Sequence, residues 1–480
     1  MKSFADLPSL PRIADNWEGN ALAFTRDPLT YMNRLVSLGP VSALVEGGNG
    51  AIMYPDTGCA GTVFVFGPEL NRQVLTQTDV FLSGPIIGPV FGEWKHDPRM
   101  SMLQRVGTGL FSLNGAEHQR QRRLIQPAFH RKQIDQYHTS MVSIAEETLH
   151  TWHAGQRIDF QREMFAHTLT VAGRTLFGQD FSGDADHLGT IIQHWLELIP
   201  LVAVSPADSD MEEFLDLSRQ IDEQIRALIA SKRTGQSDGH NVLGDLVTMT
   251  DDEGGQLSEN ELIGHINILL TAGHETTANA LSWTIFLLAQ HPRVMHAVMD
   301  ELDQVLGDSL PTLETLGRLH LLDRVIRESM RLVPPVTIGA RVMAADAVVG
   351  GYTLTRGTEI VFSHYHTHHD PTIYPEPMTF RPDRWLTIQP DAYQYLPFSA
   401  GTKMCIGAPF ALLEIKTTLA MMLQRFSFRV EDNAVIDRLV WVPLRPDNMP
   451  IVLHERDARF DHPSVVFGNI RDMIAIPRPD

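Results

Sequence analysis

Cysteine is scarce in this chain, whose 480 residues contain only two, Cys59 and Cys405. Two cysteines so far apart do not make the disulfide framework of a small secreted protein, and they fit a reducing cytoplasm. Cys59 lies in a Gly- and Asp-bearing segment without a partner histidine motif, so we predict that it is dispensable. That leaves Cys405 as the cysteine whose chemistry needs an explanation.

Long apolar runs and an excess of positive charge are also missing. The N-terminal segment has no apolar stretch that resembles a signal peptide or an anchor. The most apolar later segment, 263–289, carries too many polar side chains for a membrane-spanning helix, so we expect it to be buried in protein. With 58 acidic and 39 basic residues the net charge is −19, which argues against nucleic-acid binding. We therefore expect a soluble, cytoplasmic protein.

What the chain does contain is helical periodicity. From about residue 114 to 330 the pattern is mostly helical, after an alternating run at 61–67 that predicts a strand. Capping boxes are expected at 114–117 and at 258–261, the second opening a helix over 259–290, about 47 Å long. Further helices are expected over 319–332 and 406–424. The chain predicts a mainly α fold with a smaller β portion.

The chemistry concentrates around Cys405, in the segment Phe398-Ser-Ala-Gly401-Thr-Lys403-Met-Cys405-Ile-Gly407. Here a cysteine follows a glycine-bearing loop and directly precedes a helix, whose free N–H groups favour a thiolate. A lone cysteine is more often buried and inert, but this spacing resembles the haem-binding loop of the cytochrome P450 family. The resemblance implies haem b with Cys405 as axial ligand and Phe398, Gly401 and Lys403 beside it. Lys403 stands where the family usually has Arg or His, which keeps the charge but not the planar fork.

A second motif lies inside the long helix, at Ala272-Gly-His-Glu275-Thr276-Thr277. Hydroxyls there can bond to the preceding turn and loosen the helix. The segment resembles the family's oxygen-activation motif, which implies that Glu275 and Thr276 deliver protons and that Ala272 faces the haem. The alternative, a solvated mid-helix glutamate, is disfavoured by the apolar neighbours on both sides.

Charged residues elsewhere match further family positions. Glu328 and Arg331 share a helix face, and Arg384 follows in the segment 380–385, so the resemblance implies a buried structural network behind the haem. By the same resemblance, cofactor propionates would be bound by His118, Arg122 and Arg341. The histidines between 364 and 369 suggest a metal site, but the family has a structural turn there, and we favour structural roles.

The resemblance covers about residues 20–453 and implies the cytochrome P450 fold, with the long central helix over the haem. We expect a single haem domain over 1–453, in a monomer. Residues 454–480 form a C-terminal extension of unknown role, expected to be a packed surface tail.

The implied function is a monooxygenase that inserts one oxygen atom from O2 into a hydrophobic small molecule, by hydroxylation or epoxidation. The expected substrate-facing residues are mainly apolar: Ile86, Leu269, Val336, Ile338 and Val442. A peroxygenase or an oxidative coupling enzyme would keep the same cysteine and fold, and stays an alternative. A haem-thiolate sensor would not need Glu275 and Thr276, which counts against that class.

The chain has no flavin or iron–sulfur signature of its own, so electrons are expected from a separate ferredoxin or flavodoxin with its reductase. Part of a basic cluster is expected to lie beside Cys405 and to dock this acidic partner. The cluster consists of Arg120, Arg122, Arg123, Arg131 and Lys132.

Overall fold

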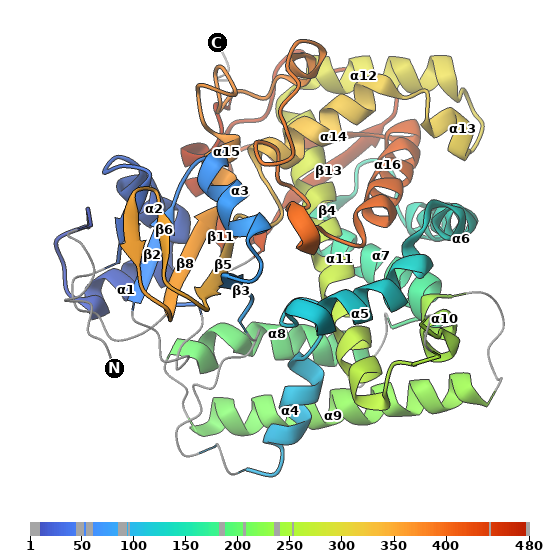
Figure 1. The fold of residues 1–480 in the computed structure, drawn as a ribbon. Coiled ribbons are helices and arrows are strands. Elements are labelled where there is room, and N and C mark those ends of the chain that lie inside the picture. Colours follow the sequence, from blue (N-terminus) through green and yellow to red (C-terminus); the bar gives the residue numbers. More distant parts are fainter. Residues whose placement is uncertain are drawn as a thin grey trace.

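A computed structural model describes residues 10–44, 52–53, 61–84, 94, 97–181, 188–204, 208–234, 241–251, 254–440 and 443–476. Helices make up most of this part (Figure 1). They are α1 (Trp17–Arg26), α2 (Pro28–Val36), α3 (Pro68–Thr76), α4 (Met100–Gly107), α5 (Gly115–Ile125), α6 (Arg131–His150), α7 (Phe160–Ala172), α8 (Leu188–Val204), α9 (Asp208–Arg233), α10 (Val242–Thr248), α11 (Glu259–Gln290), α12 (Pro292–Val305), α13 (Leu313–Leu316), α14 (His320–Leu332), α15 (His364–His368) and α16 (Ala408–Arg425).

The β portion is smaller, as predicted. Its strands are β1 (Val41–Ala43), β2 (Gly61–Val65), β3 (Phe81–Leu82), β4 (Arg157–Asp159), β5 (Ile338–Met343), β6 (Ala347–Val349), β7 (Tyr352–Leu354), β8 (Thr358–Ser363), β9 (Phe426–Val430), β10 (Ala434–Val435), β11 (Arg438–Val440), β12 (Leu444–Pro446), β13 (Pro450–Glu455) and β14 (Val466–Phe467). The largest sheet has the order β1-β2-β8-β5-β3 and lies with α1 and α2 at one side of the molecule (Figure 1). Two-residue spacing along β5 turns Ile338 and Ala340 inward.

Helix α11 runs through the middle of the helical part (Figure 1), and its predicted bounds are confirmed. The capping box is present: the Glu261 backbone N–H donates to the Ser258 hydroxyl, and the Glu261 carboxylate accepts from the Ser258 N–H at 2.6 Å. Most of its side chains are buried around its whole circumference, as expected of a helix inside a core.

Helices α4 and α11 meet backbone to backbone. A Cβ atom on Gly264 would lie 1.6 Å from the Thr108 carbonyl oxygen, so only glycine allows this approach. Three residues further on, the Asn267 amide donates to the Val106 carbonyl at 2.9 Å. The position of α11 is therefore fixed at its N-terminal third.

The capping box expected at Asn114 is wrong. Its side chain instead accepts from the Ser83 N–H at 2.9 Å and donates to the Ser83 carbonyl at 2.9 Å. Glu117 does not reach back, because its carboxylate accepts from Arg120 and Gln121. A contact to a distant segment has replaced the local cap.

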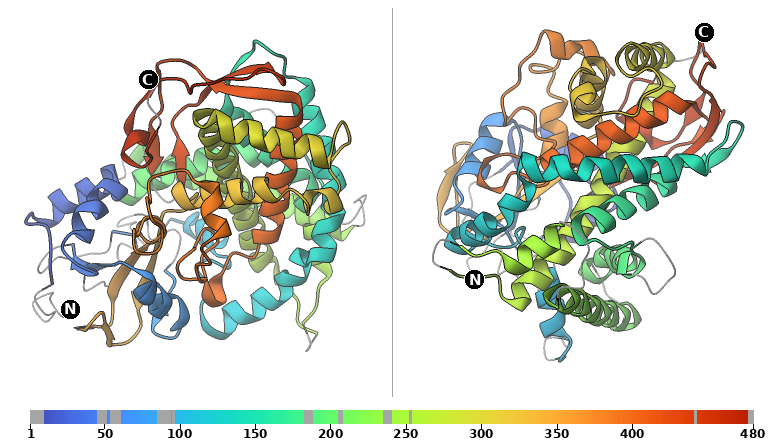
Figure 2. Two further views of the ribbon diagram at one scale, coloured as in Figure 1. Left: turned by 90° about the horizontal axis from the view of Figure 1, so that it is seen from above. Right: turned by 90° about the vertical axis from the view of Figure 1, so that its right-hand side faces the viewer.

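The C-terminal extension, predicted to be a packed surface tail, contributes a strand and buried side chains to the core. Strand β14 pairs in parallel with β10, and the short turn η7 (Asn469–Asp472) follows it. Val466, Ile470 and Met473 are at most 1% exposed and belong to the core around α11 and α16. Figure 2 shows this segment, in red, lying along the body of the molecule to the C-terminus. None of the helices in the described ranges is long and apolar enough to cross a membrane.

Candidate active site

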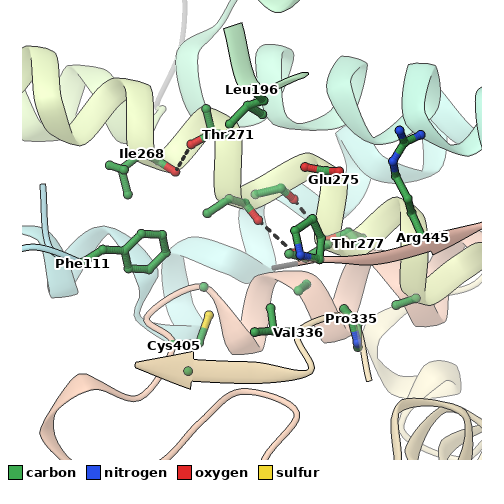
Figure 3. A pocket seen from close by; sticks show the side chains of 18 of the residues that line it. Phe111, Leu196, Ile268, Thr271, Glu275, Thr277, Pro335, Val336, Cys405 and Arg445 are labelled. Atoms are coloured by element: carbon green, nitrogen blue, oxygen red, sulfur yellow. Dashed lines mark hydrogen bonds between the residues drawn. The ribbon is translucent and has the colours of Figure 1, made fainter. Parts of the chain in front are cut away.

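A cavity of about 1420 Å³ lies between α11 and the loop that carries Cys405. Figure 3 shows Cys405 and Val336 on one side, and Glu275 and Thr277 of α11 on the other. Typical pockets for small ligands are roughly 300–1,000 Å³. This cavity is therefore large enough for a sizeable cofactor together with a substrate.

Cys405 ends a loop that is held in place by its backbone. Its N–H donates to the Phe398 carbonyl at 2.9 Å, and Gly407 and Ala408 at the start of α16 direct their N–H groups at its sulfur. Burial raises the pKa of the Cys405 thiol, while these N–H groups and Arg122 lower it. The helix start thus opposes the cost of burying a thiolate, and the sulfur faces the cavity (Figure 3).

Two residues of this loop serve tertiary contacts that the sequence did not indicate. Gly401 has φ +75°, and a Cβ atom there would lie 2.5 Å from the Leu75 carbonyl oxygen, so it allows an approach to α3. The Lys403 ammonium lines the cavity and donates to Ser83 Oγ at 2.8 Å, to Asn114 Oδ1 at 3.1 Å and to the Leu113 carbonyl. Its three donors are used by protein oxygens. Burial, with help from Arg341, lowers the pKa of Lys403 to about 7.

Three further basic side chains line the same cavity: His118, Arg122 and Arg341. Burial is the largest cause that lowers the pKa of His118 to about 4, and the neighbouring cations Lys403, Arg122 and Arg341 lower it further. Within the described residues, the Arg122 guanidinium makes no hydrogen bond or ion pair, although it is half-buried next to Cys405. A half-buried cation of this kind suits an acidic group supplied by a ligand.

On the opposite wall, α11 presents Ala272, Glu275 and Thr276 to the cavity. The Thr276 hydroxyl donates to the Ala272 carbonyl at 2.9 Å, which is the bond to the preceding turn that the sequence predicted. The helix nevertheless stays continuous from Glu259 to Gln290. Burial raises the pKa of Glu275, and the positive charge of Arg445 opposes this shift.

Behind the cysteine loop, Glu328, Arg331 and Arg384 lie together with fully buried side chains. Glu328 accepts from Arg331 at 2.9 and 3.0 Å and from Arg384 at 2.8 Å. It also accepts from the indole of Trp385 at 3.1 Å and from the Arg381 N–H at 3.0 Å. Backbone carbonyls of 368 and 375–379 accept all the remaining donors of Arg331 and three further bonds from Arg384. Such extensive hydrogen bonding is what a buried charge cluster requires.

A model of the family described as "Cytochrome P450" matches residues 48–451 of the chain. The chain belongs to the cytochrome P450 family. Curated relatives include cyclooctatin synthase of Streptomyces melanosporofaciens, 34% identical over 86% of this chain and 88% of the relative. Pentalenene oxygenase of Streptomyces avermitilis is 30% identical over 92% and 94%, and cyclooctat-9-en-7-ol 5-monooxygenase of Streptomyces melanosporofaciens is 30% identical over 91% and 93%.

Membership makes this protein a P450 monooxygenase with the mainly α fold of the family. P450 enzymes hold haem iron through a cysteine thiolate. The residues present fit that group, since a cavity-facing cysteine at a helix start lies beside the half-buried Arg122. The C-terminal extension, from residue 454, lies beyond the matched region.

The histidines between 364 and 369 all bond to protein groups. His364 pairs with the Val336 carbonyl, His366 with Ser363 and Asn33, and His369 with the Tyr365 carbonyl. His368 accepts from the Leu396 N–H at 2.7 Å. Among the residues that the structure describes, no group of histidine, cysteine and carboxylate side chains could hold a metal ion.

The expected substrate-facing residues Leu269, Val336 and Ile338 line the cavity, whereas Ile86 and Val442 lie outside the described residues. Leu196 and Thr271 also line the cavity, in segments (190–212 and 268–277) that the resemblance implied to face the substrate, whereas sequence reasoning missed two lining residues that Figure 3 labels, Phe111 and Arg445. Arg445 could have been found from the alternation of a strand after the turn at 442, whereas Phe111 sits in an irregular segment without a periodic signal.

Proposed function

We propose that Cys405 of this P450 monooxygenase would hold haem b through its thiolate, and that the enzyme inserts an oxygen atom from O2 into an apolar, ring-containing molecule of the terpene class. One observation carries the proposal. The Cys405 sulfur and the Glu275–Thr276 segment of α11 face the same large cavity from opposite walls (Figure 3).

Haem, when bound, would supply the iron and the redox chemistry that O2 activation requires. Cys405 holds negative charge at a position where the N–H groups of Gly407 and Ala408 stabilise it. Arg122, His118 and Arg341 bind the propionate carboxylates through charge and N–H donors. Lys403 anchors the loop to Ser83 and Asn114 while its charge adds to this basic end of the cavity.

On the other wall, Glu275 and Thr276 move protons. Burial favours the protonated Glu275 carboxyl, which makes it a proton donor inside an apolar space. The Thr276 hydroxyl donates to the Ala272 carbonyl; it relays a proton by accepting one on its oxygen and releasing its own when the O–H turns from that carbonyl into the cavity. Glu328, Arg331 and Arg384 keep the opposite wall in place.

The substrate class follows from the lining and from the relatives. Leu269, Ile268, Val336 and Ile338 offer an apolar surface, which gains free energy by burying hydrocarbon. Relatives whose names refer to cyclooctatin and pentalenene are 30–34% identical over most of the chain. A cyclic hydrocarbon or alcohol of that kind suits the cavity.

Electrons come from a separate acidic ferredoxin or flavodoxin that docks on part of the basic cluster. Arg120 is neutralised by Glu117 and Glu261, and Arg122 faces the cavity, so neither takes part in docking. Arg123, Arg131 and Lys132 remain exposed for a protein partner.

The deciding experiment is the absorption spectrum of the reduced, CO-bound protein, followed by titration with cyclic terpenes, including pentalenene. Thiolate ligation should give the long-wavelength Soret band that names the family, and Cys405→Ser should lose it. A terpene that fits should shift the ferric iron to high spin and be oxidised when a ferredoxin and its reductase are added. A folded wild-type protein that binds haem without the thiolate band contradicts the proposal.

A further inference from the structure

The C-terminal extension contacts the wall of the cavity as well as the core. After β14, Asn469 reaches the first strand of the hairpin formed by β11 and β12, which pair from Arg438↔Pro446 to Val440↔Leu444. The Asn469 carboxamide accepts from the Arg438 N–H at 2.6 Å and donates to the Arg438 carbonyl at 3.3 Å. The Asn469 N–H donates to Asp437 Oδ1 at 2.7 Å. One residue of the extension thus satisfies both backbone groups of Arg438.

The hairpin is part of the cavity wall. Arg438, Leu439, Val440, Pro443 and Arg445 line the cavity, and Asn469 lines it too. Figure 3 shows Arg445 at about the same height as Glu275 and on the side of the cavity away from Cys405. Whatever positions this hairpin therefore shapes the space in which a substrate lies.

Three other contacts fix the rest of the hairpin. The Leu444 N–H donates to the Pro335 carbonyl at 2.9 Å, and the Leu444 carbonyl accepts from the Trp283 indole at 3.1 Å. The Arg438 guanidinium binds the carboxylate of Asp27 at 2.9 and 3.0 Å. These contacts hold β12 and the Arg438 side chain, whereas Asn469 is the partner of the β11 backbone at its free edge.

We propose that the C-terminal extension belongs to the substrate-binding apparatus, with Asn469 as a positioning residue that holds the β11–β12 hairpin against the cavity. The hairpin then excludes or accepts ligands by their size at the end of the cavity remote from Cys405. The part of this inference that concerns ligands rests on the proposed function, whereas the part that concerns the hairpin does not.

The test uses Asn469→Ala in the haem-loaded, full-length protein. Loss of two hydrogen bonds should speed amide hydrogen exchange in the peptide 436–447 about tenfold. Clotrimazole, an azole much bulkier than imidazole, should bind the ferric protein about three- to tenfold more weakly, as followed by its Soret shift. Imidazole, which is small enough to reach the iron without touching the hairpin, should bind within about twofold of wild type.

Two further variants separate positioning from general stability. Asn469→Asp keeps the oxygen that accepts from Arg438 and should restore part of the exchange protection and of the clotrimazole affinity; it also serves if Asn469→Ala does not fold. Ser464→Ala removes a buried hydrogen bond within the same extension, from the hydroxyl to the Val430 carbonyl, and should leave exchange at 436–447 unchanged.

Unchanged exchange at 436–447 in Asn469→Ala overturns the proposal, and so does an equal loss of affinity for both ligands. If imidazole produces no Soret shift in the wild type, the proposed function fails instead. The exchange measurement still decides the role of Asn469 in that case.

Discussion

The two walls of the cavity are built in opposite ways. Behind Cys405, Arg331 has a protein partner for each of its five N–H donors, and the Glu328 carboxylate they surround is fully buried. Across the cavity, within the described residues, neither the Glu275 nor the Arg445 side chain makes a hydrogen bond, although both line it. The polar groups behind Cys405 are bonded to protein and make that wall rigid. The polar groups of the other wall stay available to protons and ligands.

The largest effect is expected behind the cysteine. Glu328→Gln removes the charge that compensates Arg331 and Arg384, and breaking a buried ion pair costs about 3–5 kcal/mol. Urea unfolding should show this loss. Glu376→Gln is the control, because its pair with Arg381 is exposed and should change stability by less than about 1 kcal/mol. Equal stability of the two variants would mean that the buried cluster does not hold this wall.

On the α11 wall, Thr276→Ala should damage chemistry rather than folding. Loss of a proton donor typically costs about 10²-fold or more, so product formed per reduced cofactor consumed should fall steeply while peroxide accumulates. The control is Thr284→Ala, which removes a similar bond to the preceding turn of α11, to the Ala280 carbonyl, away from the cavity. Full coupling in Thr276→Ala would favour the peroxygenase or oxidative coupling alternatives.

Acid should weaken the helical part that carries the α11 wall. Burial lowers the pKa values of His167, His265 and His274 to about 4, so these side chains are neutral when folded and take up protons on unfolding below about pH 6.5. Stability should therefore fall as pH drops from about 6.5 to 4, by up to roughly 1.4 kcal/mol per pH unit for each histidine. Unfolding free energies measured between pH 7.5 and 5 test this.

His274→Phe sharpens that measurement. The ring packs edge-on against Phe165 at 4.7 Å, and within the described residues its Nε2 has no hydrogen-bond partner, so phenylalanine gives up only the bond from Nδ1 to the Leu270 carbonyl. This variant should lose less stability in acid than wild type. An identical pH slope would show that His274 takes up no extra proton on unfolding.

The smallest effect concerns the outer surface. Arg123→Glu with Arg131→Glu should raise the KM for a ferredoxin several-fold at low salt and leave substrate binding unchanged, because the two side chains are exposed. Arg219→Glu, on α9, is a control charge reversal at a partly exposed arginine outside the basic cluster, where it pairs with Asp216 and Glu223. If reduction rates and their salt dependence match in all three proteins, docking occurs elsewhere.

Prediction from the sequence worked best for features that are set by neighbouring residues, such as helix ends and short motifs. The bounds of α11 follow from the Ser258–Glu261 capping box and from His291-Pro292, and the structure confirms them. Motif spacing also predicted the charged and thiol side chains that line the cavity, from His118 to Cys405, because the resemblance covers nearly the whole chain.

Prediction from the sequence failed where a distant segment binds a side chain that was expected to act locally. Asn114 binds Ser83 instead of capping α5. Arg120, expected in the docking cluster, forms an ion pair with Glu261 on α11. The C-terminal extension was underestimated for the same reason, since β14 pairs with β10 about thirty residues away and a two-residue parallel strand has no pattern of its own. The Asn469 contacts therefore became visible only in the structure.

The backbone contact at Gly264 has a practical consequence for anyone who reshapes this enzyme by mutagenesis. Even one added methyl group there would push α11 away from α4, because the Thr108 carbonyl occupies its place. Because α11 is a continuous helix, the shift would also displace Glu275, three turns further along it. A mutant library that seeks new substrates should leave Gly264 untouched and vary Leu269 or Val336, whose side chains can change size without moving the frame.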